Sequence, residues 1–262
     1  MNKPCSSNQL VNVAIITPLI VAHVMVFLQS PSLTTEIVYM FGYVASLAIM
    51  STRREYRHLL IIPVTGFVIG LTSEVAGVNT GFLFGKYKYV SLIAPRVLGV
   101  PLSVPVMWGF YAYLTYLIAS SIITCKGIVG SILRITYASL LMVILDLAMD
   151  PFMVSKIHAW VWLGGWGPTW FGIPASNFIG WFIVSFTILF THEVMAGNLS
   201  SPRAIALTIP YACLIMYFAS FIGPELAAPI AALLVTMLAV PIIIKNLYES
   251  AKTSTIEATE YP

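Results

Sequence analysis

Eight long apolar segments constrain this chain more than any other feature of its sequence. Most approach the roughly 20 residues that a helix needs to cross a hydrocarbon core about 30 Å thick. Within lipid, backbone N–H and C=O groups are satisfied only inside a helix or a closed barrel, and these segments lack the two-residue alternation of barrel strands. The segments are residues 11–28, 36–50, 59–78, 99–123, 131–149, 174–191, 204–222 and 225–244.

The composition agrees with a surface that faces lipid. Hydrophobic residues make up 59% of the chain and charged residues only 9%, whereas a soluble domain has roughly 25% charged residues. We therefore predict an all-α fold, a polytopic membrane helical bundle of about eight transmembrane helices. Seven helices are also possible, because the second segment is short. Residues 1–248 are expected to form a single transmembrane domain that retains the first segment, and residues 249–262 a disordered cytoplasmic tail.

Basic residues give the predicted bundle an orientation. Placing the basic loop 53–57 in the cytoplasm, as the positive-inside rule favours, puts both termini there and leaves nine of the 13 Lys and Arg residues on that side. The other four fall on the outer side and are Lys86, Lys88, Arg96 and Lys156. We expect a multi-pass protein of the cell membrane, in contact with membrane lipids. Because no basic stripe could follow a phosphate backbone, nucleic acid is not an expected partner.

The two longest connections, residues 79–98 and 150–173, are rich in Gly, Pro and aromatic residues, and both fall on the predicted outer side. One interpretation of Trp160, Trp162, Trp166 and Trp170 is an interfacial aromatic belt, which membrane proteins commonly have. The other is function, since long ordered loops over a rigid scaffold often carry binding and catalytic residues. The sequence leaves both interpretations open.

Three carboxylates are the main candidates for chemistry, because ionisable groups are costly inside a membrane. Glu74 lies about one turn from the outer end of its segment, while Asp146 and Asp150 share one helix face through their spacing of four residues. Pro151 is expected to end that helix, since proline lacks a donor and restricts the residue before it. Together with Asn177, the three acids are predicted to converge beneath the outer loops.

Each acid also has a structural interpretation. Asp150 can bond backbone groups at the break before Pro151, Glu74 can pair with Arg96 or Lys86, and Asp146 can be a buried hydrogen-bond anchor. Two like charges one turn apart in a low dielectric do not both ionise readily, so one of the two aspartates is expected to keep its proton. A carboxylic acid held in this way can act as a general acid.

The sequence offers no sign of metal or cofactor chemistry. The three cysteines are isolated from one another, which predicts neither a disulfide framework nor a zinc site. The patterns typical of nucleotide binding, hydride transfer and serine catalysis are absent from the sequence.

Two ordered blocks of residues carry a resemblance to a known family. The first runs from Gly81 to Tyr89 as GFLFGKYKY and continues with Pro95, Gly99-Val-Pro101, Pro105 and Trp108. The second holds Asp146-Leu-Ala-Met-Asp150-Pro151, Trp160-Val-Trp162, Gly172-Ile-Pro174 and Asn177-Phe-Ile-Gly-Trp181. Together they resemble the carotenoid biosynthesis hydratases of the bisanhydrobacterioruberin and gamma-carotene hydratase type. The resemblance implies a hydro-lyase that adds water across the terminal double bond of an acyclic carotenoid taken from the lipid phase, giving a tertiary alcohol without metal or redox cofactor.

Acid-catalysed hydration suggests roles for the candidate residues. Asp146 or Asp150 would protonate the alkene, while the other aspartate or Glu74 would orient the water, with the help of Asn177. Aromatic rings attract cations through their quadrupoles. The remaining candidates for substrate binding are Trp108, Tyr87, Tyr89, Trp160, Trp162 and Arg96.

Two other functions remain possible on the sequence. The spacing of Asp146 and Asp150 is also found in intramembrane prenyltransferases, but such enzymes need a second acidic motif, and the other acids form no such cluster. A non-enzymatic lipid- or isoprenoid-binding protein or transporter is the second alternative, which discontinuous helices and an internal repeat would favour.

The predicted orientation can be tested with single-cysteine variants in a background that lacks Cys5, Cys125 and Cys213. In intact cells, we expect a membrane-impermeant thiol reagent to label cysteine at position 86 or 156 and to spare position 54. Labelling at position 54 but not at position 86 would show that the orientation is the opposite of the predicted one.

Overall fold

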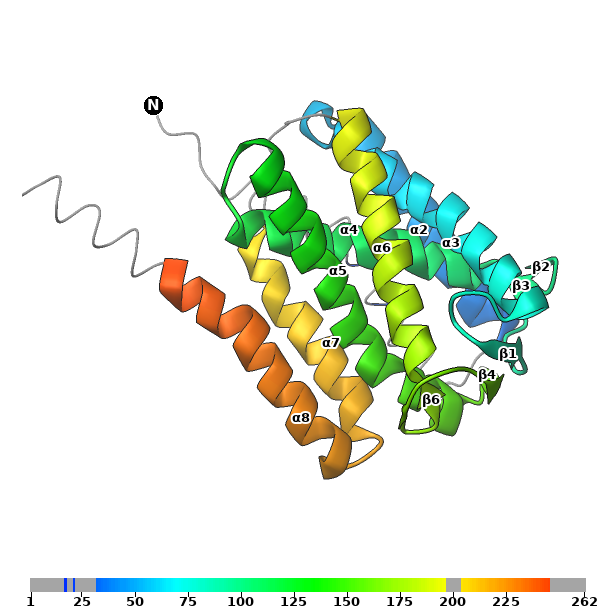
Figure 1. Cartoon of the computed structure of the whole chain (residues 1–262). Helices are drawn as coiled ribbons and strands as arrows, with labels where there is room; N and C mark the ends of the chain where they lie inside the picture. Colours follow the sequence, from blue (N-terminus) through cyan, green and yellow to red (C-terminus); the bar gives the residue numbers. More distant parts are fainter. Residues whose placement is uncertain (1–16, 18–20, 22–31, 197–203, 246–262) are drawn as a thin grey trace, which may run out of the picture.

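The computed structural model describes residues 17, 21, 32–196 and 204–245, and its architecture is a bundle of α-helices (Figure 1). In that part of the chain the helices are α2 (Leu33–Thr52), α3 (Ile61–Thr80), α4 (Ser103–Ile122), α5 (Gly127–Phe152), α6 (Ala175–Ala196), α7 (Thr208–Ser220) and α8 (Pro224–Leu234). Each corresponds to one predicted apolar segment. The first predicted segment, residues 11–28, lies outside the described residues apart from positions 17 and 21, and so does the predicted tail.

The prediction of an all-α membrane bundle is confirmed. Five of the described helical stretches are long and apolar enough to cross a membrane: Leu33–Thr52, Tyr56–Thr80, Gly127–Ile157, Ala175–Ala196 and Pro224–Lys245. The helical stretch Ile205–Ser220 is apolar but shorter. Helices α7 and α8 pack against each other and along α5, on the flank away from α3 (Figure 1).

Helix α4 lies in the middle of the bundle, in contact with α2, α3, α5 and α6. All of its residues except Met107 and Ser120 are buried. A helix that is apolar around its whole circumference is expected to be enclosed by protein or lipid, and here protein encloses it. In Figure 1 it passes behind α5 and α6. Its first turns therefore reach a part of the interior that three other long helices also line.

Two glycines allow α3 and α4 to cross at close range. A Cβ added to Gly66 of α3 would lie 2.3 Å from the Cα of Gly109 in α4, and one added to Gly109 would lie 2.5 Å from the carbonyl oxygen of Pro63. Small residues allow helix backbones to approach closely, and in lipid such van der Waals contact is a main source of association. This contact sets the distance between α3 and α4.

The two long connections contain short strands that join them at one end of the bundle. Strand β1 (Lys86–Tyr89) pairs antiparallel with β4 (Trp160–Gly164), so that Tyr87 lies opposite Trp162 and Tyr89 opposite Trp160. The side chains of β1 alternate, with Lys86 and Lys88 exposed. Two smaller ladders pair β2 (Arg96–Val97) with β3 (Val100–Pro101) and β5 (Thr169–Trp170) with β6 (Ile173–Pro174). The alternation turns both tyrosines of β1 toward the bundle.

Glu36, at the start of α2, fixes the first connection to the bundle. Its buried carboxylate accepts hydrogen bonds from the backbone N–H groups of Ile93 and Ala94 and from the hydroxyl of Ser103. Three donors on one carboxylate compensate for its burial. This acid therefore has a structural role in the loop.

The prediction that Pro151 ends its helix is wrong. Helix α5 continues to Phe152 and then passes into a π-helical turn, Met153–Ile157. Pro151 cannot donate to the carbonyl of Leu147, one turn earlier. The indole N–H of Trp170 donates to that carbonyl instead, at 2.9 Å. Because a side chain from the second loop replaces the missing donor, the helix continues past the proline.

We expect Gly66→Ala to destabilise the protein by about 1–3 kcal/mol, because the new methyl group meets backbone atoms of α4. The measurement is the midpoint of thermal unfolding in detergent. Gly164→Ala is the matched control, since nothing lies within 4 Å of its added Cβ. Equal midpoints for the two variants would contradict the proposed role of the crossing.

Candidate active site

A small cavity lies beneath the β1–β4 ladder, between α3, α4, α5 and α6. Its volume is about 30 Å³. A cavity needs at least about 10–15 Å³ to hold one water molecule. Polar residues of the lining are Glu74, Asp146, Asp150 and Asn177, and the others are Phe84, Tyr87, Tyr89, Val104, Met107, Trp108, Met149, Trp160, Trp162 and Trp181.

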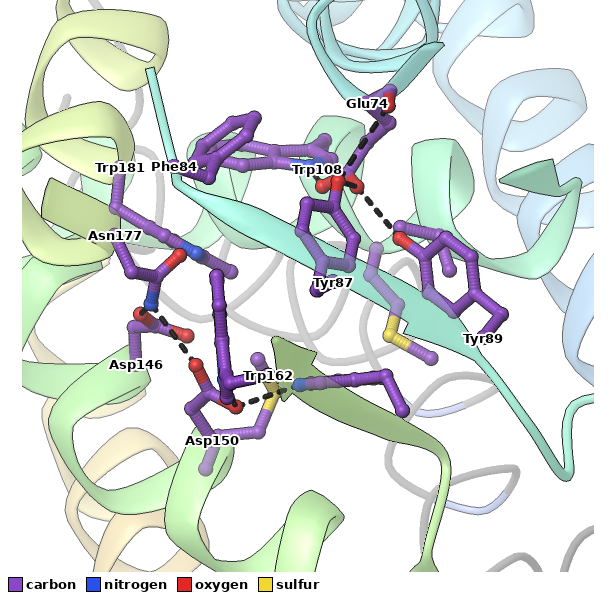
Figure 2. A pocket seen from close by; sticks show the side chains of 14 residues that line it. Glu74, Phe84, Tyr87, Tyr89, Trp108, Asp146, Asp150, Trp162, Asn177 and Trp181 are labelled. Atoms are coloured by element: carbon purple, nitrogen blue, oxygen red, sulfur yellow. Dashed lines mark hydrogen bonds between the residues drawn. The ribbon is translucent and has the colours of Figure 1, made fainter. Parts of the chain in front are cut away.

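Glu74 projects from α3 into a group of three donors. The indole N–H of Trp108 donates to Oε1 at 2.8 Å, and the hydroxyl of Tyr89 donates to Oε2 at 2.5 Å. The hydroxyl of Tyr87 donates to Oε2 as well (Figure 2). Burial raises the pKa of both tyrosines well above the usual tyrosine value, and the nearby charge of Glu74 is the second cause of the increase. Both phenols therefore keep their protons and act as donors.

Asp146 and Asp150 face one amide. The Nδ2 atom of Asn177, at the start of α6, donates to Asp146 Oδ2 at 2.7 Å and to Asp150 Oδ2 at 2.9 Å (Figure 2). Asp150 Oδ1 accepts from the indole N–H groups of Trp160, at 2.7 Å, and Trp162, at 3.4 Å. Both aspartates are almost fully buried. Asp150 thus bonds side chains of the second loop rather than backbone groups beside Pro151.

Aromatic rings form most of the remaining wall. Trp108 stacks on Trp181 with ring centroids 4.1 Å apart, and Tyr87 lies 5.0 Å from Trp162. Glycines provide the space for these rings, since a Cβ on Gly70 would lie 2.7 Å from the Cβ of Trp108. Aromatic faces of this kind stabilise a positive charge. The cavity therefore combines acidic groups with surfaces suited to a carbocation.

The structure brings together nearly all of the residues that the sequence singled out. The three acids, Asn177 and the five aromatic candidates line one cavity. Arg96 is the exception, because it is exposed in β2 and donates to the carbonyl of Leu92. Glu74 bonds tyrosine and tryptophan side chains rather than Arg96 or Lys86.

Sequence reasoning missed several residues of the lining. Trp181 follows Asn177 by four residues, one helical turn, so its place on the same face could have been inferred. Phe84 and Met149 lie within the two blocks that carry the family resemblance, whereas Val104 and Met107 carried no signal that separates them from packing residues.

The loop tryptophans divide between the two interpretations. Trp160 and Trp162 bond Asp150, and Trp170 bonds the carbonyl of Leu147. Trp166 is 59% exposed. An aromatic belt alone therefore does not explain this loop.

No group of three or more His, Cys, Asp or Glu side chains within the described ranges is arranged to hold a metal ion. The two aspartates share an amide donor instead.

Comparisons with known proteins agree with one another. Residues 34–244, most of the chain, match the family described as "Carotenoid biosynthesis protein". One similar curated protein is named bisanhydrobacterioruberin hydratase, from Haloarcula japonica, with 26% identity over 126 residues. That alignment covers 48% of this chain and 41% of the relative, so it spans less than half of either protein. No solved structure matches the chain significantly.

We expect Trp160→Phe to lower stability by roughly 1.5–3 kcal/mol, because it keeps an aromatic ring but removes a donor to a buried carboxylate. Thermal unfolding in detergent measures the effect. Trp166→Phe, at an exposed position, is the control and should leave the midpoint unchanged. If the two variants unfold at the same temperature, the bond to Asp150 contributes nothing to stability.

Proposed function

The chain belongs to the carotenoid biosynthesis protein family, and from this premise we propose that it adds water across the terminal carbon–carbon double bond of an acyclic carotenoid. The observation that carries the proposal is the cavity itself. It has room for water, and buried carboxylates lie beside aromatic faces in its wall. Hydration of an unactivated alkene needs an acid, a stabilised cation and one placed water molecule.

The reaction proceeds in two steps. A protonated carboxyl group gives its proton to the less substituted alkene carbon, where the π electron pair forms the new C–H bond. The more substituted carbon becomes a tertiary cation, facing the rings of Trp108, Trp162 and Tyr87. A lone pair of water then forms the C–O bond, and an ionised carboxylate takes the proton that the water releases. The product is a tertiary alcohol. The carboxyl group that took the proton from water then passes it back to the carboxylate that acted as the acid, which restores the starting state.

The ionised groups are well prepared for this chemistry. Glu74 accepts three hydrogen bonds and Asp150 accepts from two indoles and an amide, so each can keep a negative charge near the cation. Preorganised charges and dipoles in a dry site are the largest source of catalysis in many enzymes. They favour the cation without reorganisation of solvent.

The location suits a carotenoid. Such a molecule is an apolar rod comparable in length to the bilayer thickness, so its end groups lie near the membrane surfaces. The cavity lies at one end of the bundle, under loops that expose large apolar side chains, among them Val90, Ile93, Leu98 and Leu163. These loops are suited to the lipid interface, where an apolar end group can enter and a new hydroxyl is favoured. The relative named as a hydratase supports the same reaction class.

The test is expression of the chain in hosts that accumulate acyclic carotenoids of different lengths, with pigments analysed by mass. We expect a gain of one water per modified end. Loss of the acids in the double variant Asp146→Asn, Asp150→Asn should abolish it, whereas Cys213→Ser, at an exposed position, should not. Unchanged pigments in every host, with the protein present in membranes, would reject the proposal.

A further inference from the structure

The two aspartates of the cavity differ in the hydrogen bonds that they accept. Both oxygens of Asp150 are occupied by N–H donors, with indoles at Oδ1 and the amide of Asn177 at Oδ2. An indole nitrogen can only donate. A proton on Asp150 would remove the negative charge that strengthens the hydrogen bonds from these three N–H donors. This surrounding is suited to a carboxylate.

Asp146 has the opposite surrounding. Its Oδ2 accepts from Asn177, but its Oδ1 has no hydrogen-bond partner among the described residues, although the side chain is fully buried. An ionised oxygen left without a donor in an apolar interior is costly. A protonated Oδ1 carries no charge and presents an O–H group that is free to donate. The residue lines the cavity, so this proton is available to a bound molecule.

Asn177 contacts both aspartates in the same way, so the indoles of Trp160 and Trp162 at Asp150 Oδ1 make the two surroundings different. The amide nitrogen of Asn177 directs one N–H to each aspartate (Figure 2). Because the amide occupies Oδ2 of both residues, the aspartates do not share a proton directly through these atoms. The proton that the pair retains then belongs on Asp146 Oδ1, the one carboxylate oxygen of the pair that lacks a donor in the described structure.

We infer that Asp146 is the general acid, that Asp150 is the ionised group that accepts the proton of the attacking water, and that Asn177 is the positioning residue that keeps the two aspartates from sharing the proton through their Oδ2 atoms. This inference rests on the proposed hydration and assigns its steps to separate residues. Asp146 Oδ1–H gives its proton to the alkene carbon. Water attacks the cation and gives a proton to Asp150. Transfer of that proton to Asp146 completes the cycle.

Infrared difference spectroscopy tests the proton position without any activity. A protonated carboxyl group has a C=O stretching band that a carboxylate lacks and that shifts in D2O. At neutral pH we expect this band in the wild-type protein and in Asp150→Asn, and its loss in Asp146→Asn. A band that disappears in Asp150→Asn and persists in Asp146→Asn would overturn the inference, whether or not the protein hydrates carotenoids.

Deuterium uptake separates protonation from water capture. With purified protein, acyclic carotenoid and D2O, a cation that reverts to alkene leaves deuterium in the recovered carotenoid. We expect Asp150→Asn to yield less alcohol while still labelling the alkene. Asp146→Asn should lose both by at least about 100-fold, the smallest usual contribution of general acid catalysis. The reverse pattern would reject the assignment.

Two further variants control for folding and for the positioning role. Asp146→Glu keeps a transferable proton and should retain labelling above that of Asp146→Asn, even where the latter is unstable. Asn177→Leu removes the amide and should weaken the preference of the proton for Asp146 over Asp150. The infrared band should then no longer depend on Asp146 alone. A band in Asn177→Leu that still disappears completely with Asp146→Asn would remove Asn177 from the mechanism. If the wild-type protein does not hydrate carotenoids, the proposed function is refuted. The inferred position of the proton on Asp146 is then still tested separately by the infrared measurement.

Discussion

The described lining of the cavity contains three carboxylates and no basic residue, and this shortage of compensating charge governs the structure around it. A buried carboxylate without partners is strongly unfavourable. The compensation comes from neutral donors on distant segments, namely indoles, phenols and one amide. Since Tyr87, Tyr89, Trp160 and Trp162 all lie on the β1–β4 ladder, the two long loops must fold onto the bundle in register. The acids therefore organise the loops, and the loops in turn shield the acids from bulk solvent.

Close helix packing makes this arrangement possible. The glycine contact between α3 and α4 brings Glu74 within reach of the indole of Trp108, and Gly70 provides the space that this indole occupies. On the other side, Gly180 of α6 allows Phe84 to approach, since a Cβ there would lie 2.6 Å from the ring. Small residues thus serve the site twice, because they hold the helices together and leave room for the rings. The same packing that stabilises the bundle also compensates for the unfavourable burial of the acids.

Local sequence rules found much of this site and failed at identifiable points. Asp146, Asp150 and Asn177 were correctly placed together, because helical spacing and membrane depth are properties of single segments. Arg96 was expected to bind substrate but lies outside, since a basic side chain at the interface finds backbone carbonyls and solvent more readily than a buried site. The helix was expected to end at Pro151, but Trp170, 19 residues later in the chain, donates to the carbonyl that the proline leaves free. A rule for isolated segments has no access to such a partner.

The sequence by itself determined that this chain is a helical membrane protein and that its acids gather beneath its aromatic loops. Hydrophobicity and helical period act residue by residue, so they can be read along one dimension. Only the tertiary structure decided which donor meets which oxygen. Asn177 lies 31 residues from Asp146 and Trp108 lies 34 from Glu74, and hydrogen bonds require atomic alignment that no local pattern encodes. The difference between the two aspartates arises from that alignment. Identical side chains on one helix take different protonation states only when their neighbours differ.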